Sequence, residues 1–240
     1  MKENQTVRMM TPGQMKDIIS ATVQGVSTHM TFETAERWVG GKGKITAQVK
    51  KIFSDTNPYA DLIADWQAFY HDLSLGINWD LSGASIPDDP GGFGRIIIMA
   101  KGITPQSGYD LCAKNFPCWK YTDDDLDKIV TSERTAKNGP YAIRVRDRVE
   151  ADEELKNRSA RDLQQQGILG ITIEEREIFE LKYFTETGQH LDIVNWTLCA
   201  GSRDLGGSVP FADWGRDRFR VGWGSPSDAY GFLRSRQAVS

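Results

Sequence analysis

Apolar residues recur at helical spacing through the first 70 residues. A helix is predicted from Pro12, where Thr11 provides a cap and Gln14 stands three residues after that cap. Two further helices are predicted, one after Thr31 and one after Pro58. Together the apolar stripes predict the core of a small helical bundle. The positions that form these stripes are Met15, Ile18, Ile19, Val23, Ala35, Trp38, Leu62, Trp66, Phe69 and Tyr70.

Residues 81–94 interrupt this pattern with clustered Ser, Gly, Pro and Asp, which are strong turn signals. We therefore predict a helical N-terminal domain at residues 1–85 and a second domain at residues 90–240. In the second domain a buried strand is predicted at 95–100, and a strand with one face exposed to solvent at 141–146. Helices are predicted to begin at Thr104, Thr122 and Thr172, the last with Glu175 in a capping box and Gly188 as its stop. This alternation indicates an α/β or α+β domain.

The chain beyond Asp192 shows no convincing helical pattern. Short strands are predicted at 193–198, 209–214, 218–223 and 232–239, joined by loops that contain Gly, Ser and Asp. In the third strand the alternation of side chains directs Phe219, Val221 and Trp223 to the core, so that positions 218, 220 and 222 face outward. The loop at 224–231 follows directly and would continue the same surface.

Composition and charge exclude several classes of protein. The chain has 240 residues, with 29 Lys and Arg against 33 Asp and Glu, and its formal net charge is -4. This mild acidity argues against general nucleic-acid binding. The apolar runs are too short to span a bilayer, and the first residues lack the apolar segment of a secretory signal. Three cysteines make no disulfide framework, so we expect a reduced, cytoplasmic protein.

No catalytic or metal-binding constellation stands out, and we predict no enzyme activity, no cofactor and no metal. The histidines His29, His71 and His190 occupy no spaced metal motif. One alternative is a small cytoplasmic enzyme with a site that uses Cys112, Cys118 or His190, which an apolar pocket with a titratable pair beside them would favour. Another is an adaptor that acts through its N-terminal helices, which an exposed apolar stripe within residues 11–70 would favour.

Residues after Glu186 have an unusual composition. The chain contains 13 Lys and 12 Glu, and none of them follows Glu186. Every charged residue from Gly201 onward is Arg or Asp, and Trp196, Trp214 and Trp223 lie in the same region. Aromatic and Arg side chains among Ser, Gly and Asp are typical of binding surfaces.

The C-terminal motifs resemble a known family. Residues 207–214 follow the frame Gly-x-Val-Pro-x-x-x-Trp, residues 221–226 follow Val-x-Trp-x-x-Pro, and residues 233–240 follow Leu-Arg-x-Arg-x-x-Val-Ser. This pattern is similar to that of the variable, or target, proteins of diversity-generating retroelements, and the resemblance extends over roughly residues 90–240. It implies a C-type-lectin-like domain with short antiparallel C-terminal strands, after an N-terminal helical bundle, in an α+β chain.

The resemblance also implies a hypervariable region at about 200–240. In such systems adenines of a template are mutated, so Asn codons of the AAC type become codons that never encode Lys, Glu, Gln, Met or Trp. The lack of Lys, Glu and Met after Glu186 fits this rule. The resemblance implies a non-catalytic protein whose variable surface binds a protein or other macromolecular ligand. Because the calcium-binding triplets of sugar-binding C-type lectins are missing, we expect no calcium site.

The implied residues fall into three groups. The ligand-binding surface would comprise Asp213, Arg216, Asp217, Arg218, Arg220, Gly222, Ser225, Ser227, Asp228, Tyr230 and Phe232. The framework beneath it would comprise Trp214, Val221, Trp223, Pro226, Arg234 and Arg236. Further positions open to diversification would be Arg203, Asp204, Leu205, Ser208, Phe211, Gly224 and Ala229.

Overall fold

The computed structural model describes residues 7–8, 11–24, 31–54, 58–73 and 79–240, without the side chains of residues 7, 8, 38, 45, 50 and 52–54. The predicted roles of His29 and of the Trp38 side chain therefore lie outside the described residues. The chain divides into two compact units, residues 10–82 and residues 1–9 with 83–240. Helices and strands are mixed, in agreement with the predicted α+β class. Within the described ranges, every helix is too short or too polar to cross a bilayer.

The unit at residues 10–82 is helical. Its elements are α1 (Pro12–Gln24), α2 (Phe32–Gly40), α3 (Lys42–Ser54) and α4 (Ala60–Leu73). Thr11 caps α1 as predicted: its side chain accepts the Gln14 amide (3.3 Å), and the Gln14 side chain accepts the Thr11 amide (2.9 Å). The sequence pattern does not predict α3, because Gly40 and Gly41 are a typical helix end and α3 follows them at once.

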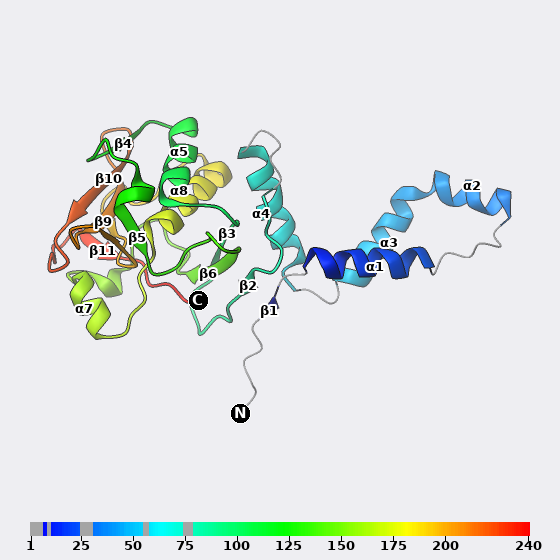
Figure 1. Ribbon diagram of the computed structural model, residues 1–240, viewed down its shortest axis with the longest axis horizontal. Helices are drawn as coiled ribbons and strands as arrows, with labels where there is room; N and C mark the ends of the chain where they lie inside the picture. The colour runs from blue at the N-terminus through cyan, green and yellow to red at the C-terminus, as the bar shows by residue number, and fades with distance from the viewer. Residues whose placement is uncertain (1–6, 9–10, 25–30, 55–57, 74–78) are drawn as a thin grey trace, which may run out of the picture. The chain divides into compact units, whose positions relative to one another are not determined.

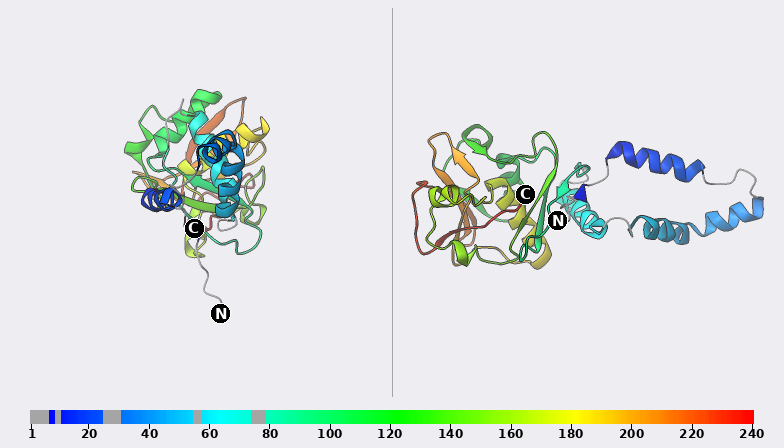
Figure 2. Two further views of the ribbon diagram at one scale, coloured as in Figure 1. Left: turned by 90° about the vertical axis from the view of Figure 1, so that its right-hand side faces the viewer. Right: turned by 90° about the horizontal axis from the view of Figure 1, so that it is seen from below.

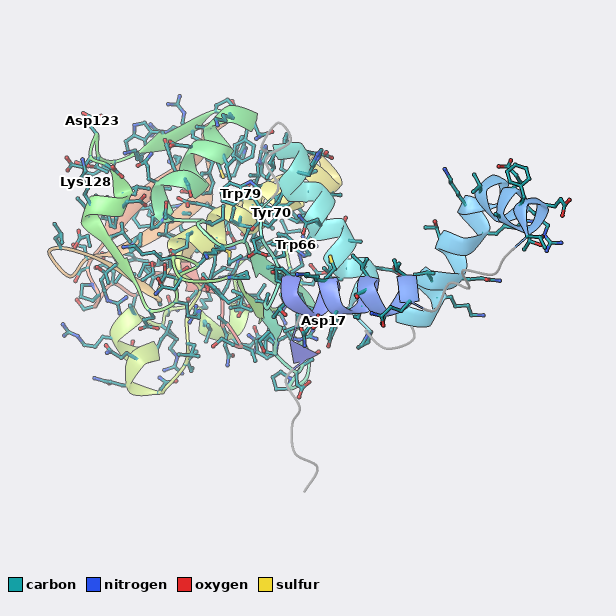
Figure 3. All side chains as sticks on the ribbon, turned by 45° about the vertical axis from the view of Figure 1, so that its right-hand side comes forward. Asp17, Trp66, Tyr70, Trp79, Asp123 and Lys128 are labelled. Atoms are coloured by element: carbon teal, nitrogen blue, oxygen red, sulfur yellow. The ribbon has the colours of Figure 1, made fainter. Side chains whose placement is uncertain are left out.

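The aromatic residues of α4 form a compact cluster. Trp66, Phe69 and Tyr70 are buried, with ring centroids 5.2–5.9 Å apart. The ring centroids of Tyr70 and Trp79 lie 6.0 Å apart, and Figure 3 labels Trp66, Tyr70 and Trp79. In contrast, α1 has no buried residue among those described. Its predicted core positions Met15, Ile19 and Val23 are exposed. A bundle core that includes α1 thus stays a prediction.

The unit at residues 83–240 is built around helix α8 (Ile173–Thr187) and a five-stranded sheet. The order of the strands is β11-β7-β9-β10-β4, and Figure 1 labels β4, β10, β9 and β11 in that order. The central strand β9 is antiparallel to β7 and β10, as predicted, whereas the edge strands β11 and β4 pair in parallel with β7 and β10. The strands are β4 (Cys118–Lys120), β7 (Trp196–Leu198), β9 (Val209–Trp214), β10 (Phe219–Gly224) and β11 (Leu233–Ser235).

Smaller elements surround α8 and the sheet. In Figure 1 and in the right-hand view of Figure 2, α8 lies between the sheet and the pair formed by β3 (Arg95–Met99) and β6 (Tyr141–Val145), and it contacts both β3 and β9. The α7 helix and the turn before it supply Leu155, Ala160 and Leu163 to a core beneath β7, β9 and β11. The remaining elements are β1 (Val7–Arg8), β2 (Ser85–Ile86), β3 (Arg95–Met99), α5 (Pro105–Asn115), α6 (Leu126–Ile129), β5 (Val130–Ser132), β6 (Tyr141–Val145), the 3-10 turn Glu153–Leu155, α7 (Ala160–Gln165) and β8 (Ser202–Asp204).

The predictions for β6 and α6 are wrong in detail. Strand β6 has no solvent-exposed face, since Ala142 to Val145 are all buried. The polar member, Arg144, stays buried because its guanidinium donates to the carbonyl oxygens of Pro87 (2.6 Å) and Phe93 (3.3 Å). Helix α6 begins after Asp125 rather than Thr122, because the Asp125 carboxylate accepts the Asp127 amide (3.0 Å) and caps the helix there.

Buried ion pairs join α8 to the end of the chain. Thr172 and Glu175 form the predicted capping box, and Gly188 ends the helix at φ 67°. Arg176 pairs with Glu180 (2.7 Å) and Asp192 (2.8 Å), and Asp192 also pairs with Arg236 (2.7 Å). All four side chains have no exposed surface, so the charges must satisfy one another.

Candidate functional site

The tip of the β9–β10 hairpin is a tight, exposed turn. The Gly215 amide donates to the Arg218 carbonyl oxygen (3.0 Å), so Arg216 and Asp217 are its two central residues. Both have positive φ, 55° and 58°, as a type I′ turn requires. The side chains of residues 216–218 are exposed. The predicted surface residues Arg216, Asp217 and Arg218 therefore lie together at one end of the sheet.

Strand β10 follows the predicted alternation with two exceptions. Phe219 and Val221 are fully buried and Arg220 faces outward, as predicted. Trp223, predicted in the core, is only half-buried. Gly222 is buried although it lies on the outward face, because the ring of Phe211 on β9 covers it.

Asp213 and Arg220 face each other across the hairpin. They are partners in the register of β9 and β10, and the Arg220 guanidinium donates to Asp213 Oδ2. Asp213 has a relative exposure of 2%, so the structure places it beneath the surface rather than on it. Burial raises the pKa of Asp213, while the charge of Arg220 opposes that shift. Gly215 leaves room for Arg220, because a Cβ there would lie 2.5 Å from Nη2.

An aromatic row continues this face toward β11. Trp196 on β7 stacks on Phe211 with centroids 4.6 Å apart, and it meets Phe232 edge-on at 4.7 Å. Phe232 in turn stacks on Tyr230 at 5.6 Å, and both are about half exposed. Trp196 belongs to none of the three groups of residues that the sequence resemblance implies. Its position beside Phe211 depends on the pairing of β7 with β9, which no local pattern encodes.

The loop after β10 is held by its own polar groups. Asp228 Oδ2 accepts the Ser225 amide (2.8 Å), and the hydroxyls of Ser225 and Ser227 lie 2.9 Å apart. The Pro226 carbonyl oxygen accepts the Arg161 amide at the start of α7 (3.0 Å). Ser225 and Ser227 are exposed and Asp228 is half-buried, so the loop presents polar side chains on a fixed backbone.

Of the sequence-predicted framework residues, Val221 and Arg236 are buried and the other four are half-buried. Arg236 is fully buried, and its guanidinium donates to the carbonyl oxygens of Arg148 (2.9 Å) and Val149 (2.7 Å) as well as to Asp192. Trp214 is half-buried, and its ring stacks on His190 with an interplanar angle of 4°. Arg234 pairs with Glu153 at 2.6 Å.

The cysteine thiols that the enzyme alternative would use have raised pKa values. Burial raises the pKa of Cys112 and Cys199 well above the usual value, and it raises that of Cys118 to about 12. A nucleophilic thiol needs the opposite shift. A cavity of about 390 Å³ is lined by Arg134, Tyr141 and others, but not by these cysteines or His190. In the part of the chain that is described, no three His, Cys, Asp or Glu residues are grouped to hold a metal ion.

Comparison with known proteins found no matching family model, no matching curated protein and no matching solved structure. The site offers exposed Arg, Ser and Tyr side chains and an aromatic row on a sheet with buried interior side chains. Such an arrangement is suited to contact with another molecule.

Proposed function

We propose that the chain is a non-catalytic binding protein that contacts a macromolecular ligand through its C-terminal hairpin and the loop after it. The observation that carries this proposal is the contrast between buried and exposed residues in the β9–β10 hairpin. Phe219 and Val221 have a relative exposure of 0%, while the turn at 216–218 is exposed. Exposed side chains can be exchanged on such a frame with little effect on stability.

The proposed protein type is a variable protein of a diversity-generating retroelement with a C-type-lectin-like domain, located in the cytoplasm. Two observations support it. Lys and Glu are missing after Glu186 in a chain that otherwise uses both freely. The implied framework residues Val221 and Arg236 are buried, whereas most implied variable positions are exposed or half-buried. Asp213 and Gly222, which are buried, would be the variable positions with least freedom.

The DNA around the gene provides a direct test of this type. The expected finding is a near-copy of codons 200–240 that differs almost solely where the copy has adenine, with a reverse-transcriptase gene beside it. If the DNA contains neither a repeat nor related copies that differ at the implied positions, the assignment is overturned.

The binding role is tested separately, with Arg216→Ala, Arg218→Ala and Tyr230→Ala combined. We expect unchanged melting and lost ligand binding, and a collapsed fold would assign these residues to the core.

A second candidate function is that of an adaptor that acts through its N-terminal helices. The exposed positions Met15, Ile19 and Val23 lie on one face of α1 and favour it. Replacement of all three by Ser tests it. Retained helicity with lost association would support the adaptor role, and unchanged association would remove it.

A further inference from the structure

The loop at residues 192–195 lies next to two segments of the proposed binding surface, the turn at 216–218 and the aromatic segment at 230–232. The Trp214 amide donates to the Asp192 carbonyl oxygen (3.1 Å), which places one side of the loop against the start of the hairpin turn. The Trp196 amide donates to the Phe232 carbonyl oxygen (2.8 Å), which places the chain just after the loop against the aromatic segment. The turn at 216–218, this loop and residues 230–232 thus meet at one end of the sheet.

Two aliphatic side chains on this loop are exposed. The relative exposure is 58% for Ile193 and 75% for Val194, and Tyr230 and Phe232 in the adjacent segment are exposed by 50% and 43%. Single exposed apolar residues are common on protein surfaces, but several on adjoining segments mark an interaction site. Neither Ile193 nor Val194 belongs to the implied variable segment.

The backbone of the loop is fixed by one carboxylate. Glu150 Oε1 accepts the amides of Ile193 and Val194, each at 3.1 Å, and Oε2 accepts the amide and the side-chain nitrogen of Asn195, each at 2.9 Å. The residue before the loop, Asp192, is held at φ 55° by its buried ion pairs. Because the backbone is already ordered, contact with a partner costs little further conformational entropy.

The charges around the loop indicate the chemistry of a partner. From Leu191 to Ala200 the one charged residue is Asp192, which is buried and paired, and the Glu150 carboxylate that contacts the loop accepts four N–H groups of it. The neighbouring turn adds exposed Arg216 and Arg218 against a single Asp217. The charge of Arg220 is compensated by Asp213. An apolar centre with a cationic border is complementary to an apolar side chain flanked by carboxylates.

We propose that Ile193 and Val194 form a fixed apolar anchor of the binding surface, and that its partner is a protein segment with an aliphatic or aromatic side chain next to Asp or Glu. This inference rests on the proposed binding function and deepens it. The anchor supplies affinity that does not change when the residues of the turn change. Glu150 is the positioning residue, since it holds the loop in place.

Selection of a phage-displayed library of random dodecapeptides on the full chain tests this proposal. We expect enriched peptides to combine an aliphatic or aromatic residue with adjacent Asp or Glu. The most enriched peptide, made synthetically, should lose about tenfold or more in affinity for the Ile193→Ser/Val194→Ser variant. Leu169→Ser is the matched control, because Leu169 is 42% exposed on the loop between α7 and α8, outside the implied variable segment, and it should bind as the unmodified chain does. Melting curves verify that each variant folds.

The outcomes separate the anchor from the proposed function. If no peptide is enriched, or if the peptide binds the Ile193→Ser/Val194→Ser variant as tightly as the unmodified chain, the anchor is overturned. If the peptide binds that variant normally but no longer binds Arg216→Ala/Arg218→Ala, the proposed function stands. If the peptide binds both variants as tightly as the unmodified chain, both proposals are overturned. Glu150→Gln should speed amide hydrogen exchange at residues 193–195 and lower the affinity of the peptide for the chain. Unchanged hydrogen exchange would show that Glu150 does not position the loop.

Discussion

The ring of Phe211 lies over Gly222 on the neighbouring strand, in the space that a side chain at position 222 would occupy. The two residues are paired in the register of β9 and β10, so the volume at one position limits the volume at the other. If both positions vary, as the sequence resemblance implies, they are expected to vary together.

Gly222→Ala should destabilise the chain by about 1–3 kcal/mol, because the added methyl group displaces the Phe211 ring and its stack on Trp196. In a Phe211→Ala background the same change should cost almost nothing, which urea unfolding of the double-mutant cycle measures. Gly94→Ala is the control, since a Cβ at Gly94 meets no atom within 4 Å. An equal cost in both backgrounds would contradict the coupling.

The hairpin turn has residues that its backbone does not favour. Arg216 and Asp217 both have positive φ, where a residue such as Arg costs about 1–2 kcal/mol and Asn-Gly is preferred. The free energy of unfolding of the Arg216→Asn/Asp217→Gly variant should therefore be about 1–2 kcal/mol higher, which thermal unfolding measures. Arg218→Asn has no such strain to relieve and should show no gain, so equal gains for the two variants would refute this explanation.

Glu177 makes the stability depend on pH. It is fully buried in α8 against Gly108 of α5, and neither carboxyl oxygen has a hydrogen-bond partner among the described residues. Burial raises its pKa well above the ordinary value of 4.5, and the nearby carboxyls of Glu174 and Asp127 add to the shift. The protonated form stabilises the fold. That contribution is complete below about pH 4.5 and declines as the pH rises through the folded-state pKa.

Glu177→Gln keeps the shape but cannot ionise. Its stability relative to the unmodified chain should therefore increase as the pH rises above about 4.5. Urea unfolding between about pH 4 and pH 8 measures this difference. Glu174, whose pKa burial raises to about 7, is present in both proteins and does not account for it. Parallel stability curves for the two proteins would show that Glu177 does not titrate in this range.

Arg236 should be among the most sensitive positions of the chain. Arg236→Met removes one cation from Asp192 and leaves a buried carboxylate with one partner fewer, at a cost of about 3–5 kcal/mol. Arg148→Met is the comparison, because its pair with Glu154 is 43% and 51% exposed and is worth about 0–1 kcal/mol. Chemical denaturation ranks the two variants, and similar costs would argue against the buried network.

Local signals predict some elements correctly and long-range pairing accounts for the rest. Thr172, Glu175 and Gly188 predict both ends of α8, since capping depends on neighbours in sequence. The bounds of β9 also follow from its local pattern. The parallel pairing of Phe219 with Cys118 joins residues about 100 positions apart, and no local pattern encodes it.

The candidate site shows the same division. Alternation places Arg220 correctly on the outward face of β10. It cannot reveal that Asp213 is buried, because that depends on the guanidinium of Arg220 and on the space above Gly215. Nor can it reveal Ile193 and Val194 as exposed neighbours of the turn, since their position depends on Glu150, more than 40 residues earlier.

Residues 233–239 also determine when the unit at residues 83–240 can complete its fold during synthesis. Val239 pairs with Arg144, and the Ala238 amide donates to the Leu169 carbonyl oxygen (2.8 Å). Until these residues leave the ribosome, Asp192 lacks the cation of Arg236 and the sheet lacks β11. A product that ends within residues 203–232 would thus stay open to proteases. The fold itself would act as a check that the segments of the proposed binding surface have been translated.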